Sequence, residues 1–414
     1  MGRVRLATKG SAMLQKFYQV IWSGLLCFGL VSTATAQSLA EMAAYQMAEQ
    51  KIAENAASGY PKLDLGRVKD LQYLPPPLAD SKHLREIILG SQYCTPGRIS
   101  CDREGPALND ISVLAQLPNL KVLDLGSVAV LDEELIASLT GLRVLSLANT
   151  SVKDLSFLSE MTQLQELNLW FNPVTDLSPL AGLTGLRKLG LNNTQVTDIS
   201  PLSEMKGLIK ISLDETMVSD LSPLADMAEL QILTLGNTPV SDISAVAGMT
   251  QLKKLGLANT QVQNVEPISE LPNLQTLYLG GTRVERVRSL IHLDSLITLD
   301  IGNTAIDSII PFKKNTSLEY LGLQNTNVVW LKPIENLTAL TRLDISNTRV
   351  SEIPWLSSLV NLKRLNMQGT AVSDLTPLVG LPALAIVSAN NGVKPLQPGP
   401  VAKLREQGVR IIDD

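Results

Sequence analysis

A repeat of 22 residues dominates this sequence and constrains its fold more than any other feature. Leucine opens a new unit at every twenty-second position from Leu120 to Leu362, and twelve units fill residues 120–383 without an insertion or deletion. The unit reads L-x-x-L-x-L-x-x-T-x-V-x-D-L-S-P-L-x-x-L-x-x, most completely in Leu186–Gly207. A period held in register for so long predicts a stacked repeat protein rather than separate compact domains.

Each unit predicts one turn of a coil. Leu189 and Leu191 alternate with polar residues, as in a short strand with one face turned inward, and the strands of successive units would stack in parallel. On the return side, Ser200 suits a helix cap and Pro201 the first helical position. The predicted fold class is an α/β solenoid, curved, with a parallel β-sheet on the concave face and short 3-10 or helical turns on the convex side.

The ninth position of the unit carries a hydroxyl group in nearly every repeat. We expect this hydroxyl to bond to backbone groups of its own and neighbouring units, because a tight coil would otherwise leave polar atoms unpaired. We interpret these residues as structural and not as ligand-binding. They are Thr150, Thr194, Thr216, Thr238, Thr260, Thr282, Thr304, Thr326, Thr348 and Thr370, with Asn172 once in the same position.

The sequence divides into five segments. Residues 1–36 predict a signal peptide, and residues 37–83 predict an N-terminal helical cap and lead-in, with Leu39, Met42, Tyr45 and Ile52 at near-helical spacing. Residues 84–119 form a first repeat with a cysteine-bearing insert, and residues 120–383 form the twelve 22-residue repeats. Residues 384–414 predict a C-terminal cap, with a helix at 401–407 and a closing strand at 409–412. Both ends of a repeat stack need such caps because they expose apolar faces.

The first segment has the parts of an export signal. Basic residues precede an apolar run from Val20 to Val31, and Ala34-Thr35-Ala36 offers small residues for cleavage after Ala36. An uncleaved membrane anchor is one alternative, although the run is shorter than the roughly 20 residues of a span. A lipoprotein at Cys27 is another, although the residues before it are not small. We therefore expect an exported protein, periplasmic, cell-surface or secreted, with no membrane span in the mature chain.

The charge of the chain argues against general nucleic-acid binding. The formal net charge is -5, and the first 36 residues hold four basic residues and no acid, so removing them leaves -9. An acidic body repels a phosphate backbone unless it carries a dense basic surface.

Cys94 and Cys101 both lie in the insert of the first repeat. An even number of cysteines in an exported chain favours a disulfide between them. Two free buried thiols remain an alternative, and so does half of a metal site. The spacing is not that of a common zinc motif, and the chain has only His83 and His292 to complete a ligand set.

The segments Asp176-Leu177-Ser178-Pro179-Leu180 and Asp198-Ile199-Ser200-Pro201-Leu202 resemble the 22-residue leucine-rich repeats of internalin-like bacterial surface proteins. The resemblance covers about residues 84–390. It implies a leucine-rich-repeat curved solenoid that recognises proteins on its concave sheet. Family members usually carry asparagine at the ninth position, where this chain has threonine.

Four aromatic residues are candidate anchors on the concave face. Thirteen strands, about 4.8 Å apart, would span roughly 60 Å, which is room for a protein partner. Along this face Trp170 and Phe171 interrupt the usual small residues, and Tyr278 and Tyr320 stand two units apart. Exposed aromatic side chains on a rigid surface are common interface anchors. The alternative is that Phe171 turns inward and Trp170 lies along a neighbouring strand.

Basic residues recur beside these aromatic residues. We favour the interpretation that these basic residues form ion pairs with acids such as Glu166, Asp300 and Asp344. The alternative is that they bind an acidic patch on a partner or an anionic glycan. The basic candidates for partner binding are Arg187, Lys188, Lys210, Lys254, Arg342 and Arg364, and Lys121, Arg143, Lys253 and Lys363 continue the same column.

The Asp-Leu-Ser-Pro signature of the outer side decays between residues 283 and 312. Arg283, Arg286 and Arg288 come first, and Trp330 and Trp355 then replace the usual aspartate and proline. We interpret this change as drift on a side that tolerates it, with a second contact surface as the alternative.

Together these features predict a module that binds a macromolecular partner, expected to be a protein, through its concave face. The alternative is a structural or glycan-binding component of the cell envelope. An enzyme is not expected, because neither His83 nor His292 has a nucleophile motif nearby and the sequence has no glycine-rich phosphate loop. We expect no cofactor, no metal and a monomer.

Overall fold

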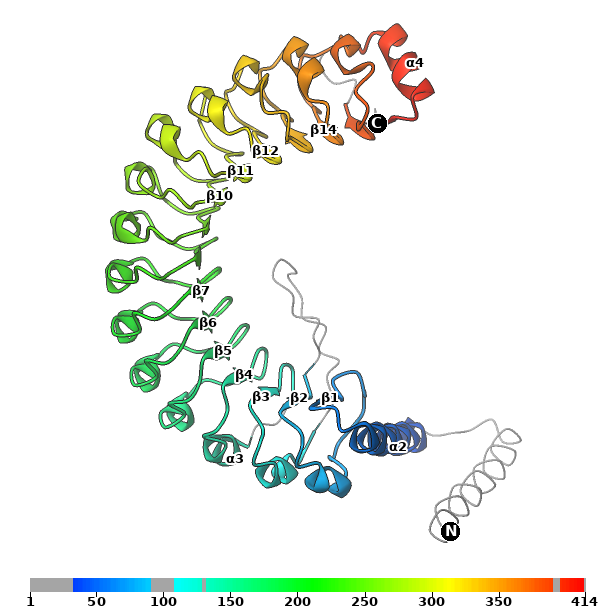
Figure 1. Ribbon diagram of the computed structural model, residues 1–414, viewed down its shortest axis with the longest axis vertical. Coiled ribbons are helices and arrows are strands. Elements are labelled where there is room, and N and C mark those ends of the chain that lie inside the picture. The colour runs from blue at the N-terminus through cyan, green and yellow to red at the C-terminus, as the bar shows by residue number, and fades with distance from the viewer. Residues whose placement is uncertain (1–32, 91–107, 129–131, 390–394, 413–414) are drawn as a thin grey trace, which may run out of the picture.

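The computed structural model describes residues 33–90, 108–128, 132–389 and 395–412. Within these residues, sixteen short strands form one parallel sheet in sequence order, from β1 to β16. The chain coils into an open arc, with the sheet on the inner side and short helical turns on the outer side (Figure 1). The predicted curved solenoid is confirmed.

The strands are three residues long, with one residue turned inward between two that face the concave side. They are β1 (Lys62–Asp64), β2 (Glu86–Ile88), β3 (Val122–Asp124), β4 (Val144–Ser146), β5 (Glu166–Asn168), β6 (Lys188–Gly190), β7 (Lys210–Ser212), β8 (Ile232–Thr234), β9 (Lys254–Gly256), β10 (Thr276–Tyr278), β11 (Thr298–Asp300), β12 (Tyr320–Gly322), β13 (Arg342–Asp344), β14 (Arg364–Asn366), β15 (Ile386–Ser388) and β16 (Arg410–Ile412).

The outer side carries 3-10 turns in nearly every unit. They are η1 (Pro76–Asp80), η2 (Ser112–Gln116), η3 (Ser156–Leu158), η4 (Ser178–Leu180), η5 (Ser200–Leu202), η6 (Ser222–Leu224), η7 (Ser244–Gly248), η8 (Glu266–Ile268), η9 (Arg288–His292), η10 (Ile310–Lys314), η11 (Lys332–Ile334), η12 (Pro354–Ser358) and η13 (Thr376–Leu378). The α-helices are α2 (Thr33–Ser58), α3 (Glu133–Ser138) and α4 (Pro398–Glu406).

The expected count of thirteen strands is too low. The strand β1 lies in the lead-in, where the 22-residue period is absent, and β15 extends the sheet beyond the last full unit. The closing strand β16 and the helix α4 confirm the predicted C-terminal elements. The strands β1 and β16 are therefore the two edges of the sheet, and the helices α2 and α4 pack next to them.

The core is a continuous column of apolar side chains, repeated from unit to unit. In the unit that starts at Leu186, Leu189 from the strand and Val196 and Leu202 from the return side are at most 1% exposed. Because β6 and β7 pair in register, Leu189 lies opposite Ile211 of the next unit. Equivalent apolar residues therefore stack along the whole arc, and each unit depends on its neighbours for burial.

The threonines of the ninth position bond within their own units. Thr194 donates its hydroxyl to the Leu191 carbonyl at 2.6 Å, and the other ladder threonines repeat this contact. Asn172 bridges two units instead, since its amide donates to the Leu147 carbonyl at 2.7 Å and accepts from Val152 N at 3.1 Å. The structural role of this ladder is confirmed, but the threonine hydroxyls mostly serve their own unit.

The predicted cap of the outer turn is wrong in detail. Ser200 is the first residue of η5, and the aspartate two positions earlier supplies the side-chain acceptor: Ser200 N donates to Asp198 Oδ1 at 2.8 Å. The equivalent bond from Ser222 N lowers the pKa of Asp220. The aspartate of the unit therefore fixes the turn through a local side-chain to backbone bond.

The N-terminal helix α2 packs on the end of the solenoid with a face that matches the predicted one only in part, since Ile52 is buried and Tyr45 is half-buried. Ala44, Ala48 and Ile52 are buried, whereas Leu39 and Met42 are 39% and 49% exposed. Alanines at a spacing of four residues form one helix face and let the helix approach closely.

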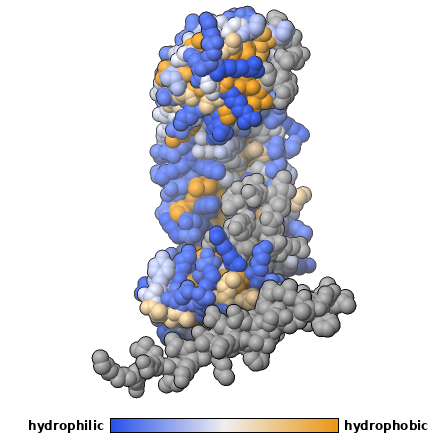
Figure 2. All heavy atoms as spheres, turned by 90° about the vertical axis from the view of Figure 1, so that its right-hand side faces the viewer, coloured by the Kyte–Doolittle hydropathy of each residue, from blue (hydrophilic) through white to orange (hydrophobic). Residues whose placement is uncertain are grey.

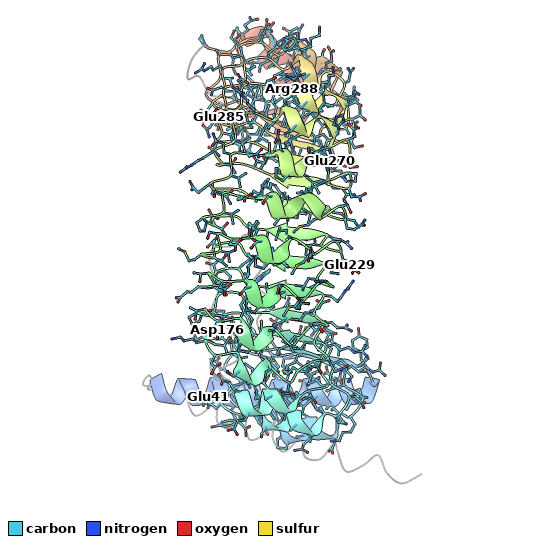
Figure 3. All side chains as sticks on the ribbon, turned by 90° about the vertical axis from the view of Figure 1, so that its left-hand side faces the viewer. Glu41, Asp176, Glu229, Glu270, Glu285 and Arg288 are labelled. Carbon is cyan, nitrogen blue, oxygen red and sulfur yellow. The ribbon has the colours of Figure 1, made fainter. Side chains whose placement is uncertain are left out.

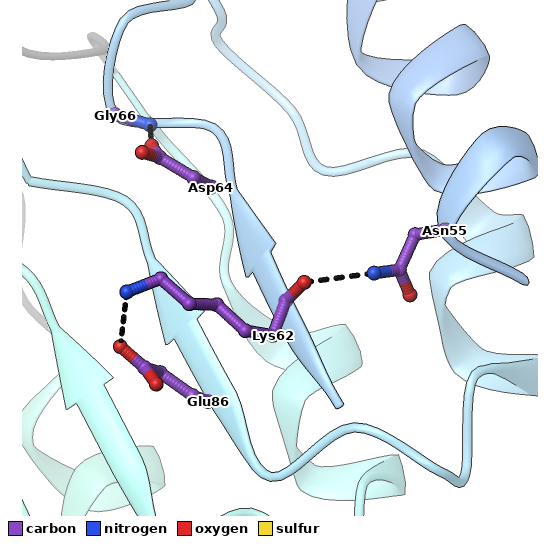
Figure 4. Close-up of polar contacts among 5 residues, drawn as sticks. All are labelled: Asn55, Lys62, Asp64, Gly66 and Glu86. Atoms are coloured by element: carbon purple, nitrogen blue, oxygen red, sulfur yellow. Dashed lines mark hydrogen bonds and ion pairs between the residues drawn. The ribbon is translucent and has the colours of Figure 1, made fainter. Parts of the chain in front are cut away.

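Polar contacts tie α2 to the first two strands (Figure 4). Asn55 donates to the Lys62 carbonyl at 2.8 Å, and Lys62 Nζ lies 2.7 Å from Glu86 of β2. The side chain of Asp64 accepts from Gly66 N at 3.0 Å. The helix is thereby joined through β1 to the repeat stack.

Candidate functional site

The concave face is built from the two outward residues of each strand and the residue that follows the second core leucine. In β6, Lys188 and Gly190 flank the buried Leu189, and Asn192 follows Leu191. Figure 2 looks into this side, where a largely hydrophilic surface is interrupted by apolar patches. The sheet makes the positions of these side chains rigid, because neighbouring strands pair at fixed register.

Tyr278 and Tyr320 each form a cation–π pair with a predicted basic residue. Lys254 Nζ lies 5.5 Å from the centroid of the Tyr278 ring, and the Arg342 guanidinium lies 4.8 Å from the centroid of the Tyr320 ring. Both rings are partly exposed. The structure therefore brings four of the predicted residues together as two aromatic–cation pairs on the concave side.

Acidic groups surround the Tyr320 hydroxyl. Along the sheet, Asp300, Gly322 and Asp344 are consecutive register partners, and the Tyr320 hydroxyl reaches over the glycine. Burial, together with the charges of both aspartates, raises the pKa of Tyr320 to about 12. The hydroxyl thus stays protonated at neutral pH and is available as a hydrogen-bond donor.

Asp300 lies in the floor of the same site. Its carboxylate accepts from Gly302 N at 2.9 Å and from Gln324 Nε2 at 3.2 Å, while burial raises its pKa. Gln324 Oε1 is buried and has no hydrogen-bond partner among the described residues. The sequence pattern did not single out Gln324. The available signal was an amide at a position where the two preceding units have Gly280 and Gly302.

Trp170 is not an exposed anchor. The side chain is only 9% exposed, and its indole nitrogen occupies the space above Gly190 of the next strand, 2.3 Å from where a Cβ would lie. The interpretation in which Trp170 lies along a neighbouring strand therefore describes the structure. Glycine permits this because it leaves a side-chain-sized gap on the sheet.

Phe171 is partly exposed and has a φ of 58°. Equivalent positions hold Asn193 at 55°, Asn237 at 58° and Gly281 at 73°, so the coil requires a left-handed residue here. A bulky aromatic residue adopts this conformation at a cost of order 1–3 kcal/mol. Phe171 is thus held at the rim of the sheet by the surrounding coil.

Ion pairs occupy two of the predicted cations. Lys188 lies 2.7 Å from Glu166, and Arg187 lies 2.9 Å from Glu229, so pairing explains these residues. Lys210 and Arg364 form no ion pair within the described ranges. Arg342 is exposed beside the Tyr320 ring. The cations open to an anionic partner therefore include Lys254 and Arg342 beside the tyrosines, Lys210 in β7 and Arg364 in β14.

Several predictions fall outside the described residues. Cys94 and Cys101 lie in 91–107, and the apolar run of the predicted signal peptide lies in 1–32. Among the residues that the structure describes, no cluster of histidine, cysteine or acidic residues suits a metal ion. No described helix is both long and apolar enough to cross a membrane.

His83 has a structural contact. Its Nε2 lies 2.9 Å from Asn55 Oδ1, which joins the residue before the first repeat to the end of α2. His292 is exposed at the end of η9. Neither histidine faces the concave site.

Comparison with known proteins agrees with this architecture. A family model described as Leucine Rich repeats (2 copies) matches residues 140–182, 162–204, 250–292 and 338–380. A crystal structure of an internalin from Listeria monocytogenes shares 28% identity and a TM-score of 0.63, covering 66% of this chain and 82% of that one. The chain therefore contains leucine-rich repeats and is similar to internalins. This fold is typical of protein-binding modules.

Two further structures share the fold of this internalin-like protein. A leucine-rich-repeat protein from Leptospira interrogans has 17% identity and a TM-score of 0.59, with 87% of this chain and 97% of that chain covered. The ectodomain of the Arabidopsis thaliana receptor kinase GASSHO1/SCHENGEN3, solved in complex with CASPARIAN STRIP INTEGRITY FACTOR 2, has 19% identity and a TM-score of 0.59, with 83% and 49% covered. No curated protein matched the chain by sequence.

Proposed function

We propose that this internalin-like protein is an exported module that binds a protein partner through its concave face. The observation that carries the proposal is the pair of tyrosine–cation contacts, Tyr278 with Lys254 and Tyr320 with Arg342, on a rigid parallel sheet. Aromatic and arginine side chains dominate the binding energy of protein interfaces because they bury large areas with little loss of side-chain freedom.

The proposed contact surface has a centre and a periphery. The tyrosines and Arg342 form the centre, with Lys254 beside them, and Lys210 and Arg364 extend the positive charge on either side. Arg187 and Lys188 contribute less, since both are already paired with acids. Trp170 supports the sheet from its buried position, and Phe171 offers an apolar edge near the N-terminal half of the surface.

A protein partner is favoured over a small molecule because the surface is long and open. The similar plant receptor ectodomain is solved in complex with CASPARIAN STRIP INTEGRITY FACTOR 2, which supports a role in binding for this architecture. A partner with carboxylates at its contact surface would complement Lys210, Arg342 and Arg364. We propose that the protein acts as a monomer, with a disulfide between Cys94 and Cys101.

The test is affinity capture from the organism's own envelope and surroundings with the full-length chain. The wild type is compared with the double variant Tyr278→Ala/Tyr320→Ala, and Tyr60→Ala, 61% exposed at the N-terminal end, is the matched control. We expect one protein to be recovered with the wild type and the control and to fall at least tenfold with the double variant. Equal recovery by all three would move the site away from the concave face.

The alternative is a structural or glycan-binding component of the envelope. It predicts that recovery depends on polysaccharide and disappears after glycan digestion, while protein digestion leaves it intact. The opposite sensitivity supports the protein-binding proposal. Export itself is tested by cell fractionation and by sequencing the mature N-terminus, which we expect at Gln37.

A further inference from the structure

The convex side changes character between residues 283 and 336. The thirteenth position of the unit is aspartate in five successive units, at 154, 176, 198, 220 and 242. It becomes Arg286, Ser308 and Trp330 in three consecutive later units. Asn264 and Glu352 hold this position in the flanking units, and aspartate returns at 374. The change is therefore centred on one block of the solenoid, whose edge lies near Glu285 and Arg288 on the convex side (Figure 3).

These replacements remove a bond that stabilises the outer turn. Asp220 accepts from Ser222 N at 2.8 Å, whereas the Ser308 hydroxyl is 3.5 Å from Ile310 N, and arginine or tryptophan offers no acceptor. A hydrogen bond of this kind contributes about 1 kcal/mol. Two of three neighbouring units lose this bond and the third keeps only a longer one, which indicates a surface shaped for another purpose.

Three apolar residues lie close together on the convex side although they occupy different positions of the 22-residue unit. Ile291 stands where most units have alanine or serine, Ile310 where five units have serine, and Trp330 where most have aspartate. They are 37%, 49% and 48% exposed. The repeat register brings these three apolar residues onto adjacent turns, so they form one exposed apolar patch.

Two adjacent grooves run across this patch. The first, about 460 Å³, lies between η9 and η10, and the second, about 430 Å³, lies between η10 and η11. Ile310 lines both grooves and forms the ridge between them. Trp330 lines the second groove, and Trp355 braces it edge-on, with ring centroids 5.9 Å apart and planes at 85°.

A groove between two units of the usual type serves as an internal comparison. Between η6 and η7 the groove measures about 230 Å³, and its charged lining residues are Asp220 and Asp242. The two grooves of the patch are larger and carry the opposite charge balance. Their charged lining residues are Arg286, Arg288, Lys313, Lys314 and Lys332, with the acids Glu285, Asp307 and Glu335. None of these five cations forms an ion pair with any residue in the described ranges.

We propose that these paired grooves are a second binding site, for a short acidic segment of a partner protein that inserts apolar side chains on both sides of Ile310. Unpaired cations at the rim would meet the carboxylates of the segment, and Ile291, Ile310 and Trp330 would bury its apolar side chains. Peptides are commonly recognised through a few apolar side chains that are buried in pockets beside aromatic residues, and Trp330 would be such a residue here. The site is independent of the concave face.

An acidic peptide fits these grooves better than the other occupants. An anionic membrane is met by side chains that project from a surface, whereas here the apolar atoms line recesses between turns. A second copy would have to place its own acidic turns, such as those of Asp198 and Asp220, into the grooves across two convex surfaces, which touch over a small area.

The test uses a variant that restores the usual unit. Ile291→Ala, Ile310→Ser and Trp330→Asp return three positions to residues found elsewhere in the repeats, so this groove variant should fold at least as well as the wild type. Val360→Ser, which removes an exposed apolar side chain outside the grooves, is the matched control. A displayed library of random dodecapeptides is selected on the full-length wild-type chain, with counter-selection on the groove variant.

We expect the selected peptides to combine apolar residues with Asp or Glu. Their affinity, measured by fluorescence anisotropy, should fall at least tenfold for the groove variant and stay unchanged for Val360→Ser and for Tyr278→Ala/Tyr320→Ala. The last result separates this site from the concave one. The proposal is overturned if no peptide is enriched, if the peptides lack acids, or if the groove variant binds equally well. It is also overturned if the groove variant instead loses binding to phosphatidylserine vesicles or loses self-association in sedimentation.

Discussion

The Tyr320 hydroxyl lies 2.8 Å from the position that a Cβ on Gly322 would occupy. The two residues sit two positions apart on β12, so the ring folds over the glycine and is held between the neighbouring aspartates. Asp300 Oδ1 is 2.9 Å from the same point. The absence of a side chain at Gly322 thus allows the Tyr320 ring, the proposed interface anchor, to occupy this position.

Gly322→Ala should displace the Tyr320 ring. The added methyl group meets the tyrosine hydroxyl and the Asp300 carboxylate, so the ring must swing towards solvent and lose burial. We expect its pKa to fall from about 12 towards the ordinary value of 10.0. The measurement is ultraviolet absorbance of phenolate against pH, with Tyr320→Phe to assign the signal.

Gly256→Ala is the control for this substitution, because a Cβ there meets the Thr234 methyl group at an ordinary 3.4 Å. Its tyrosine titration should match the wild type. An unchanged pKa of Tyr320 in Gly322→Ala would contradict the assigned role of the glycine.

Gly190→Ala should destabilise the protein through Trp170. The new Cβ would lie 2.3 Å from the indole nitrogen, and displacing a buried ring from a packed site costs about 1–3 kcal/mol. Urea unfolding followed by circular dichroism measures the loss. Gly182→Ala, where a Cβ meets no atom within 4 Å, should leave stability nearly unchanged. Equal stability of both variants would show that Trp170 rearranges freely.

The turn aspartates should make stability fall in acid. The bonds from Ser156, Ser178, Ser222 and Thr376 lower the pKa values of Asp154, Asp176, Asp220 and Asp374 below the ordinary value of 3.8. A depressed pKa in the folded state gives stability that is complete well above 3.8 and is lost as pH falls through the lower folded value.

Replacing these four aspartates with asparagine keeps an acceptor oxygen and removes the titration. The free energy of unfolding of the fourfold variant should therefore fall less steeply than that of the wild type between about pH 4 and pH 2. Asp307→Asn, at a groove-lining residue with no such turn bond described, is the single-site control. Parallel pH profiles for wild type and fourfold variant would refute the assignment.

The sequence predicts best what each unit encodes by itself. The inward leucines, the threonine bond to the carbonyl three residues earlier and the outer turns recur at fixed positions, so the period alone places them. The capping residue of the turn was misassigned because Asp198 and Ser200 are both good cap formers and only geometry distinguishes them.

Features that depend on two units escaped sequence-based prediction. Trp170 lies over Gly190 of the next strand because glycine has no side chain there. Gln324 donates a hydrogen bond to Asp300 of the preceding unit. The face of α2 was predicted correctly at Ile52, but Ala44 and Ala48 were missed because alanines carry little hydrophobic signal. These positions depend on small or absent side chains or on contacts in a neighbouring unit or element. The pattern of a single unit contains no information about them.

Thr194→Val should destabilise the protein although it keeps the shape of the side chain. The hydroxyl donates to the buried Leu191 carbonyl at 2.6 Å, and an unpaired buried carbonyl costs about 1–3 kcal/mol. Thr194→Ser should retain most of the stability, since it keeps the donor, and Thr197→Val on the exposed side should change little. Urea unfolding of the three variants checks this order. If Thr194→Val and Thr197→Val were equally stable, the ladder would owe its recurrence to packing of the methyl group, and the hydrogen bond would have no part in holding the coil.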